Sequence, residues 1–179
     1  MITPARITWT FLAPSLPRPA GGLIALFEVV NAIAGEGRDL VRLVHLPTAD
    51  AQVRDLGDLP WFTFDDAVEH HFATSLDPDE LPDSDVVVFT TMLLAVALAP
   101  GTEAVGRRLV ESLHDGQRSW CPLLFLQGSG VFPPAVEDLA LRLPGPKVCV
   151  GSWLVECLLQ RGVPAAEVVH IPNGVDPHR

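Results

Sequence analysis

Short apolar runs rich in β-branched residues alternate with segments of helical periodicity along this sequence of 179 residues. Such alternation is typical of a parallel sheet whose strands are joined by crossover helices. The expected strands are Arg6–Leu12, Val41–Leu46, Val86–Phe89, Leu123–Leu126, Lys147–Val150 and Val168–Ile171, with Leu59–Phe64 as a candidate for one more. We therefore predict an α/β fold. It is a single Rossmann-like domain over residues 1–179, in which an open, mostly parallel sheet of six or seven strands carries helices on both faces.

Apolar residues at helical spacing fill the intervals between the expected strands. The expected helices are Leu23–Ile33, a region after Phe89 that breaks at Pro100-Gly101, Ala135–Leu143, and a helix that contains Leu154–Leu159. The last of these has the clearest boundary signals. Ser152 is expected to cap its N-terminus, and Gly162 is expected to occupy the left-handed position that follows a helix C-terminus.

Composition places the chain among packed globular proteins, because 48% of its residues are hydrophobic and only 19% are charged. The formal net charge is -10, and no cluster of lysines and arginines offers a surface to nucleic acid or an anionic membrane. The longest apolar stretch, residues 86–99, is shorter than the roughly 20 residues that span a bilayer. No transmembrane segment or signal peptide is therefore expected. The three cysteines, which form no C-x-x-C pair, are expected to be reduced, buried packing residues of a cytoplasmic protein: Cys121, Cys149 and Cys157.

Two adjacent glycines, Gly21 and Gly22, stand where the first expected strand leads into the first expected helix. Ligands of open α/β sheets bind at the carboxyl ends of the strands, and a helix N-terminus there presents free N–H groups to an anion. Glycine also allows a phosphate to approach the backbone closely. Taken alone, however, the pair is explained more simply by a flexible loop that needs glycine only to turn.

The loop before these glycines excludes the best-known nucleotide-binding fingerprints. In a dinucleotide-binding G-x-G-x-x-G motif the glycines follow the strand directly, whereas Ala13–Ala20 intervenes here with three prolines. No Gly-Lys-Ser/Thr of a P-loop follows either. Gly128-Ser129-Gly130 lacks the G-x-S-x-G spacing of a nucleophile elbow. We interpret Gln127–Gly130 as a loop at the end of a strand, where it would line a cleft.

The most informative segment is the last third of the sequence, which reads KVCVGSWLVECLLQRGVPAAEVVHIPNGVD over residues 147–176. It contains a strand, a helix that begins with serine, a glycine, another strand and then Ile-Pro-Asn-Gly-Val-Asp. This arrangement resembles the retaining glycosyltransferases of family 4, which have the GT-B fold. The Gly-Gly loop between the first strand and the first helix is also similar to the corresponding loop of these enzymes. The run Leu-Phe-Leu-Gln-Gly at residues 124–128 is similar to the sequence at this place in bacterial enzymes that build surface glycans. Residues 47–82 resemble no segment of the family.

The resemblance implies the N-terminal, acceptor-side domain of an enzyme that transfers a sugar from a nucleotide-sugar donor to a glycan, lipid-linked or small-molecule acceptor. The donor-binding C-terminal domain is expected to lie beyond residue 179. Residues 172–179 would begin the linker to it, with Asn173, Gly174 and Asp176 at the domain junction. Gly21 and Gly22 would approach the donor diphosphate. Neither a metal nor another cofactor is expected, and residues 1–179 alone are expected to be inactive.

Six residues at the ends of the expected strands are candidates for contacts with the acceptor or the cleft: Thr90, Thr91, Gln127, Gly128, Ser152 and Trp153. Many enzymes of the family have a histidine after the strand equivalent to Val86–Phe89, where this sequence has the two threonines. The resemblance therefore assigns no catalytic residue. Trp153 could stack on a sugar, but partial burial on its helix is the simpler expectation.

The pair His70-His71 invites a metal interpretation, because Asp65, Asp66 and Glu69 are nearby. Adjacent residues of a helix do not share a face, so a solvated acidic surface is the better interpretation. His45, at the end of an expected strand, is interpreted as a structural histidine with its hydrogen bonds satisfied.

Two other classes of function stay open. A stand-alone, non-catalytic α/β binding or interaction module would need no second domain. A flavodoxin-like or NAD-binding protein is a further alternative, which the missing dinucleotide fingerprint disfavours.

Overall fold

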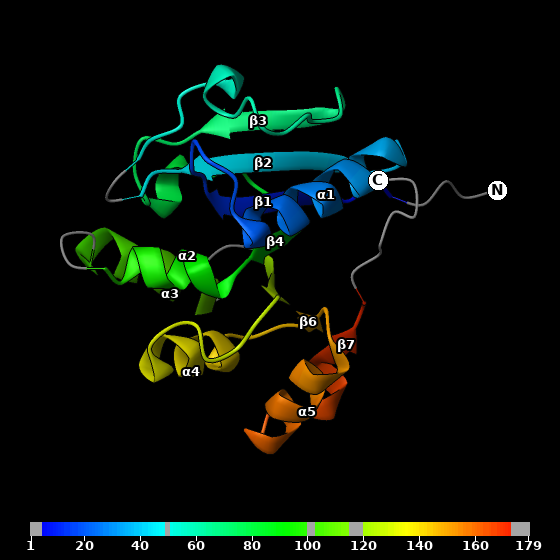
Figure 1. Ribbon diagram of the computed structural model, residues 1–179, viewed down its shortest axis with the longest axis vertical. Helices are drawn as coiled ribbons and strands as arrows, with labels where there is room; N and C mark the ends of the chain where they lie inside the picture. The colour runs from blue at the N-terminus through cyan, green and yellow to red at the C-terminus, as the bar shows by residue number, and fades with distance from the viewer. Residues whose placement is uncertain (1–4, 49–50, 100–102, 115–119, 173–179) are drawn as a thin grey trace.

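The computed structural model describes residues 5–48, 51–99, 103–114 and 120–172. Its centre is one open sheet of seven strands in the order β3-β2-β1-β4-β5-β6-β7, and every neighbouring pair is parallel (Figure 1). The strands are β1 (Thr8–Pro14), β2 (Leu40–Leu46), β3 (Val68–Phe72), β4 (Val86–Phe89), β5 (Cys121–Leu126), β6 (Lys147–Cys149) and β7 (Val168–His170).

Helices connect most of these strands. They are α1 (Gly21–Gly35), α2 (Thr91–Ala97), α3 (Glu103–His114), α4 (Pro134–Arg142) and α5 (Ser152–Gln160). Three short 3-10 turns lie in the remaining connections: η1 (Leu56–Asp58), η2 (Pro78–Glu80) and η3 (Ala165–Glu167). The predicted fold class is confirmed: the protein is a Rossmann-like α/β domain with an open parallel sheet.

The sheet has an apolar core on each face, because successive side chains of a strand point to opposite sides. On one face, Phe11 of β1 packs in a buried cluster with Phe27 of α1. On the other face, Leu12 belongs to a larger cluster that includes Leu93 of α2 and Leu154 of α5. Helix α1 therefore covers one face, and α2 to α5 cover the other.

The order of the strands reverses between β1 and β4. From β1 the chain moves outward through β2 to β3, then returns to the middle of the sheet and moves outward the other way from β4 to β7. In open α/β sheets the crevice at such a reversal, outside the carboxyl ends of the strands, is where ligands bind.

The seventh strand is not where the sequence placed it. Leu59–Phe64 forms no strand, since the Phe62 N–H bonds back to the Leu59 carbonyl in a turn. Its aromatic side chains pack against Phe27 instead, with ring centroids 5.2 Å apart for Phe62 and 5.0 Å apart for Phe64. The strand is Val68–Phe72, an edge strand paired with β2.

The boundaries of α5 correct one prediction and confirm another. Gly151, and not Ser152, is the N-cap residue, so Ser152 is the first helical residue, and no side chain caps this end. Gly162 follows the C-terminus with φ of +82°, the left-handed conformation that was predicted for it.

The cysteines differ from one another in exposure. Cys149 is buried as expected, Cys157 is half-buried, and Cys121 is exposed, which corrects the prediction that all three are buried. Cys121 is exposed because it is the first residue of β5. The apolar residues further along this strand are the ones that are buried.

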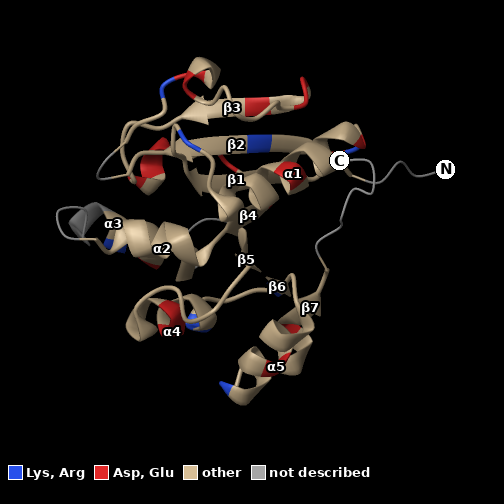
Figure 2. Ribbon diagram, viewed as in Figure 1, with Lys and Arg blue, Asp and Glu red and all other residues tan. Residues whose placement is uncertain are grey.

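Charged side chains are distributed over the described chain, and its lysines and arginines are scattered along the ribbon (Figure 2). Arg107 and Arg108 on α3 are adjacent. Among the described residues, no helix combines the length and the apolar character that crossing a membrane requires. The same residues contain no group of three or more His, Cys, Asp or Glu side chains that could hold a metal ion.

Candidate functional site

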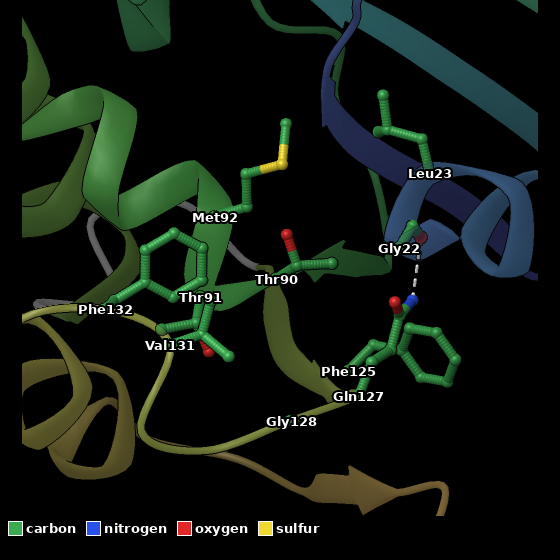
Figure 3. Close-up of a pocket in the computed structure, with 10 residues that line it drawn as sticks. All are labelled: Gly22, Leu23, Thr90, Thr91, Met92, Phe125, Gln127, Gly128, Val131 and Phe132. Carbon is green, nitrogen blue, oxygen red and sulfur yellow. Dashed lines mark hydrogen bonds between the residues drawn. The ribbon is translucent and has the colours of Figure 1, made fainter. Parts of the chain in front are cut away.

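A pocket with a volume of about 270 Å³ opens at the carboxyl edge of the sheet, where the strand order reverses. Its walls come from the start of α1, from the junction between β4 and α2, and from the end of β5 with the loop that follows it (Figure 3). The lining residues are Gly22, Leu23, Thr90, Thr91, Met92, Phe125, Gln127, Gly128, Val131 and Phe132.

Gln127 joins two walls of the pocket. Its Nε2 donates a hydrogen bond of 2.9 Å to the carbonyl of Gly22, 105 residues earlier in the chain (Figure 3). A Cβ atom on Gly22 would lie 2.8 Å from Gln127 Oε1, closer than such atoms approach. Glycine at position 22 is therefore what allows this side chain to rest against the start of α1.

The N-terminus of α1 is open on the side of the pocket. Ala20 is its N-cap and provides no side-chain cap, no acidic residue lies in the first turn, and the first bond of the helix runs from the Ile24 N–H to the Ala20 carbonyl. The N–H groups of Gly21, Gly22 and Leu23 thus point out of the helix, at the positive end of its dipole. A Cβ atom on Gly21 would meet nothing within 4 Å.

The β4–α2 junction presents a hydroxyl group. Thr90 is the N-cap residue of α2, yet its side chain makes no capping hydrogen bond. Its hydroxyl is therefore not committed to the helix, and Figure 3 shows this side chain between Met92 and Gly22. Thr91, the first residue of α2, is buried beside it.

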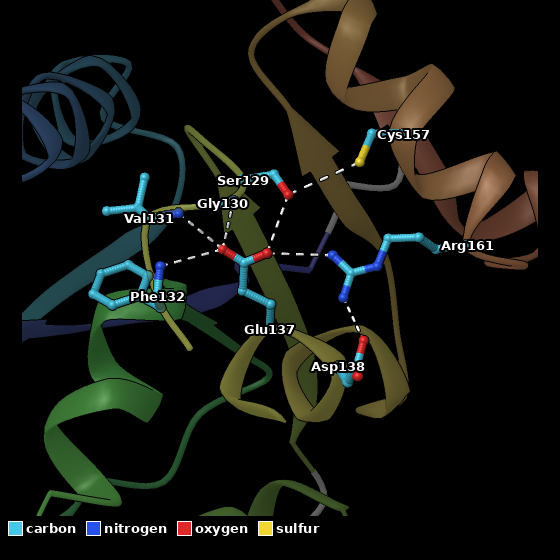
Figure 4. Close-up of polar contacts among 8 residues, drawn as sticks. All are labelled: Ser129, Gly130, Val131, Phe132, Glu137, Asp138, Cys157 and Arg161. Carbon is cyan, nitrogen blue, oxygen red and sulfur yellow. Dashed lines mark hydrogen bonds and ion pairs between the residues drawn. The ribbon is translucent and has the colours of Figure 1, made fainter. Parts of the chain in front are cut away.

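A buried carboxylate holds the third wall, the loop Gln127–Phe132. Oε1 of Glu137 accepts hydrogen bonds from the backbone N–H groups of Gly130, Val131 and Phe132 at 2.7, 3.1 and 3.3 Å (Figure 4). Oε2 accepts from the Ser129 hydroxyl at 3.1 Å. A carboxylate that binds a run of backbone amides in this way fixes the path of the loop.

The charge of Glu137 is balanced by Arg161, the residue that follows α5. Arg161 Nη1 lies 3.3 Å from Glu137 Oε2, and its Nη2 pairs with Asp138 (Figure 4). Burial raises the pKa of the Glu137 carboxyl, but the hydrogen bonds from the loop outweigh burial and leave this pKa below its ordinary value. Glu137 is therefore ionised at neutral pH, as its role in holding the loop requires.

Comparison with known proteins gives few matches. No protein-family model and no curated protein matches this sequence. Two crystal structures of the Anabaena protein HepE, one in complex with UDP and glucose and one in complex with UDP-glucose, are similar to 96% of this chain at 16% sequence identity. Their TM-scores are 0.48 and 0.46, and the similarity covers 45% of the HepE chain. This chain therefore spans less than half the length of HepE.

The structure brings five of the candidate residues together around the pocket: Gly22, Thr90, Thr91, Gln127 and Gly128. Gly21 lies next to them, at the exposed start of α1. Their roles toward a donor or an acceptor stay predictions.

The other candidates lie apart from the pocket. Ser152 and Trp153 begin α5 after β6, at the same edge of the sheet but outside the lining. Trp153 is 55% exposed, and its indole is partly buried, as expected, because it rests over the backbone of Gly151 at the open end of the helix. The predicted domain junction lies outside the described residues: Asn173, Gly174 and Asp176.

Several residues of the site were not predicted. Met92, Phe125, Val131 and Phe132 line the pocket, and Glu137 holds its loop. Phe125 lies within a continuous apolar run, which gives no sign of the face to which each side chain points. One signal in the sequence could have indicated Glu137. It is an acidic residue in the first turn of α4, directly after a loop that follows a strand.

The histidines form a separate cluster. His45 is buried, with Nδ1 2.8 Å from the Ser15 hydroxyl and Nε2 3.0 Å from Nδ1 of His70. The prediction of a structural, hydrogen-bonded His45 is thus confirmed. The solvated surface predicted for His70-His71 is correct for His71 only. Because the two lie on a strand and not on a helix, His70 turns inward and stacks on His45, with centroids 5.3 Å apart.

Proposed function

We propose that this chain is the acceptor-side domain of a retaining glycosyltransferase that uses a nucleotide-sugar donor. The observation that carries the proposal is the convergence of Gly22, Thr90 and Gln127, from the segments that follow three different strands, on one pocket at the reversal of the sheet. The resemblance of the segment that ends in Ile171–Asp176 to family 4 supports the same conclusion.

The start of α1 suits the donor diphosphate. The N–H groups of Gly21, Gly22 and Leu23 face outward, and Gly21 leaves room for a phosphate oxygen to come close. A site of this kind offers local positive potential in a molecule whose net charge is -10. Amides that are fixed before the reaction stabilise the negative charge that grows on a departing diphosphate.

The acceptor would occupy the pocket itself, with its reacting hydroxyl close to Thr90 and the start of α1. In the transfer, the acceptor oxygen forms a bond to the anomeric carbon, and the bond between that carbon and the diphosphate oxygen breaks. The electron pair of the broken bond leaves with the nucleoside diphosphate, and the proton of the acceptor hydroxyl is released to water. No metal or other cofactor takes part in this proposal.

The partner that completes the site is a second, donor-binding domain of the same enzyme, joined through residues 172–179. Asn173, Gly174 and Asp176 would form the junction, and residues 1–179 alone would not transfer sugar. We place this enzyme in the cytoplasm, where nucleotide sugars are made.

The natural protein that contains this chain tests the proposal. It is incubated with UDP-, GDP- and dTDP-sugars and a set of alcohol and sugar acceptors, and the released nucleoside diphosphate and the glycoside are quantified. We expect release that depends on the acceptor, and a product with the anomeric configuration of the donor by NMR. No transfer from any donor would refute the proposal, and an inverted product would refute its retaining mechanism.

A further inference from the structure

The lining of the pocket is unusual for a site that would hold a sugar. Half of its ten residues are apolar and large: Leu23, Met92, Phe125, Val131 and Phe132. Two others are glycines. The polar side chains are those of Thr90, Thr91 and Gln127, and none of the ten residues is charged. Figure 3 shows Leu23 and Phe125 on the side of α1, and Met92 and Phe132 on the side of α2, so apolar groups face the space from both sides.

These polar groups are too few for a sugar ring. A pyranose carries a hydroxyl on most of its carbons, and each hydroxyl that loses water without gaining a partner weakens binding. The amide nitrogen of Gln127 already donates to the Gly22 carbonyl, and Thr91 is buried within the wall. The N–H groups at the start of α1 are assigned to the diphosphate in the proposed function. The side-chain groups that remain are the Thr90 hydroxyl, which caps no helix, and Gln127 Oε1, and these can pair with only one or two hydroxyls of a ligand.

The size of the pocket sets a second limit. Its volume of about 270 Å³ lies just below the range of about 300–1,000 Å³ for small-molecule sites. One or two fused rings fill such a space, while the remainder of a larger acceptor would extend outside. Met92 can adapt its flexible side chain to the outline of a ring, and Phe125 and Phe132 offer flat faces or edges.

We infer that the acceptor places an uncharged, predominantly apolar ring group in this pocket and presents one hydroxyl beside Thr90. The acceptor class is therefore an aromatic or alicyclic alcohol, and not a glycan. This inference rests on the proposed function, because only a glycosyltransferase would use the bound group as an acceptor. The preference of the pocket for an apolar ring does not depend on that function.

Binding of 2-naphthol and of maltose to the protein, each measured by isothermal titration and by ligand-observed NMR, tests the inference. The informative variant is Val131→Asp, because Val131 is 71% exposed at the mouth and its replacement leaves the core intact. The matched control is Val169→Asp on the edge strand β7, where the valine is 40% exposed. A carboxylate at position 131 would have to lose water when an apolar ring binds beside it.

We expect 2-naphthol to bind the wild type, to bind Val131→Asp about tenfold more weakly or worse, and to bind Val169→Asp unchanged. Maltose should give no measurable saturation. Tighter binding of maltose than of 2-naphthol, or equal binding of 2-naphthol by wild type and Val131→Asp, would overturn the inference.

The transfer assay separates this inference from the proposed function. If 2-naphthol binds in the pocket but no nucleotide sugar yields a naphthyl glycoside or any other glycoside, the glycosyltransferase proposal fails while the binding preference stands. If the protein glycosylates maltose and not 2-naphthol, the proposed function stands and the acceptor class is wrong.

Discussion

His45 is an imidazole in the core, with 1% of its surface exposed. Its two nitrogens face the Ser15 hydroxyl and His70, and the Phe72 ring stacks on it with centroids 4.7 Å apart. Burial, and then the proximity of His70, lower the pKa of His45 to about 3. The side chain is therefore neutral in the folded protein at neutral pH.

This environment makes the free energy of unfolding depend on pH. The folded pKa of about 3 lies below the ordinary value of 6.5, so the unfolded chain binds the proton more readily. The stabilisation is complete above pH 6.5 and is lost as the pH falls from there toward 3, by about 1.4 kcal/mol for each pH unit. Urea unfolding at a series of pH values should show a slope in the wild type that includes this contribution.

The variant His45→Gln should flatten the slope by roughly one proton, since glutamine does not titrate. His71→Gln, on the exposed side of the same sheet edge, is the control and should change the slope much less than His45→Gln does. Equal slopes for wild type and His45→Gln would show that His45 does not resist protonation in the fold.

Among the elements, the loop between β5 and α4 depends most on one side chain. Glutamine at position 137 would keep one acceptor oxygen but would place an NH2 group toward the N–H groups of the loop or toward Arg161. We expect Glu137→Gln to lower the free energy of unfolding by about 1–3 kcal/mol. We also expect faster hydrogen exchange at Gly130, Val131 and Phe132, measured by NMR.

Asp138→Asn provides the matched control, because Asp138 pairs with the same arginine from a side chain that is 51% exposed. An exposed ion pair contributes about 1 kcal/mol or less, so this variant should change stability little and leave the loop amides protected. If both variants have the same effect, the backbone bonds of Glu137 do not hold the loop.

The sequence predicted the elements around the site better than those at the periphery. β4 and β5 are continuous apolar runs, as expected of central parallel strands, and were placed within two residues. β3 was not predicted because this edge strand has polar residues such as Glu69 and His71 on its exposed face, which hides the apolar pattern of a strand. Leu59–Phe64 was wrongly predicted as a strand because its aromatic residues pack on α1 without strand pairing.

The contacts of the site were predictable only in part. The reversal of the strand order places the ends of β1, β4 and β5 side by side, so residues that follow those strands could be expected to converge. The bonds that make the site rigid gave no such signal. Gln127 and Gly22 are 105 residues apart, and Glu137 and Arg161 are 24 residues apart, so no local spacing relates the partners.

The whole molecule is acidic, with a net charge of -10, yet the proposed donor is an anion. Long-range attraction therefore cannot account for donor binding, and the start of α1 has to supply the favourable contact locally. In the proposed complex a diphosphate lies against the backbone at Gly21, where an added Cβ atom would meet no atom within 4 Å beyond its chain neighbours and its own helix backbone.

The most direct test is the rate of sugar transfer by the natural protein that contains this chain, with Gly21→Ala compared with Gly35→Ala at the other end of the same helix. An added Cβ atom on Gly35 makes an ordinary contact of 3.5 Å with Asp65, and neither change lowers stability, because alanine favours a helix over glycine by about 1 kcal/mol. We predict that Gly21→Ala loses about tenfold or more in transfer rate while Gly35→Ala keeps the wild-type rate. Equal rates in the two variants would contradict the account.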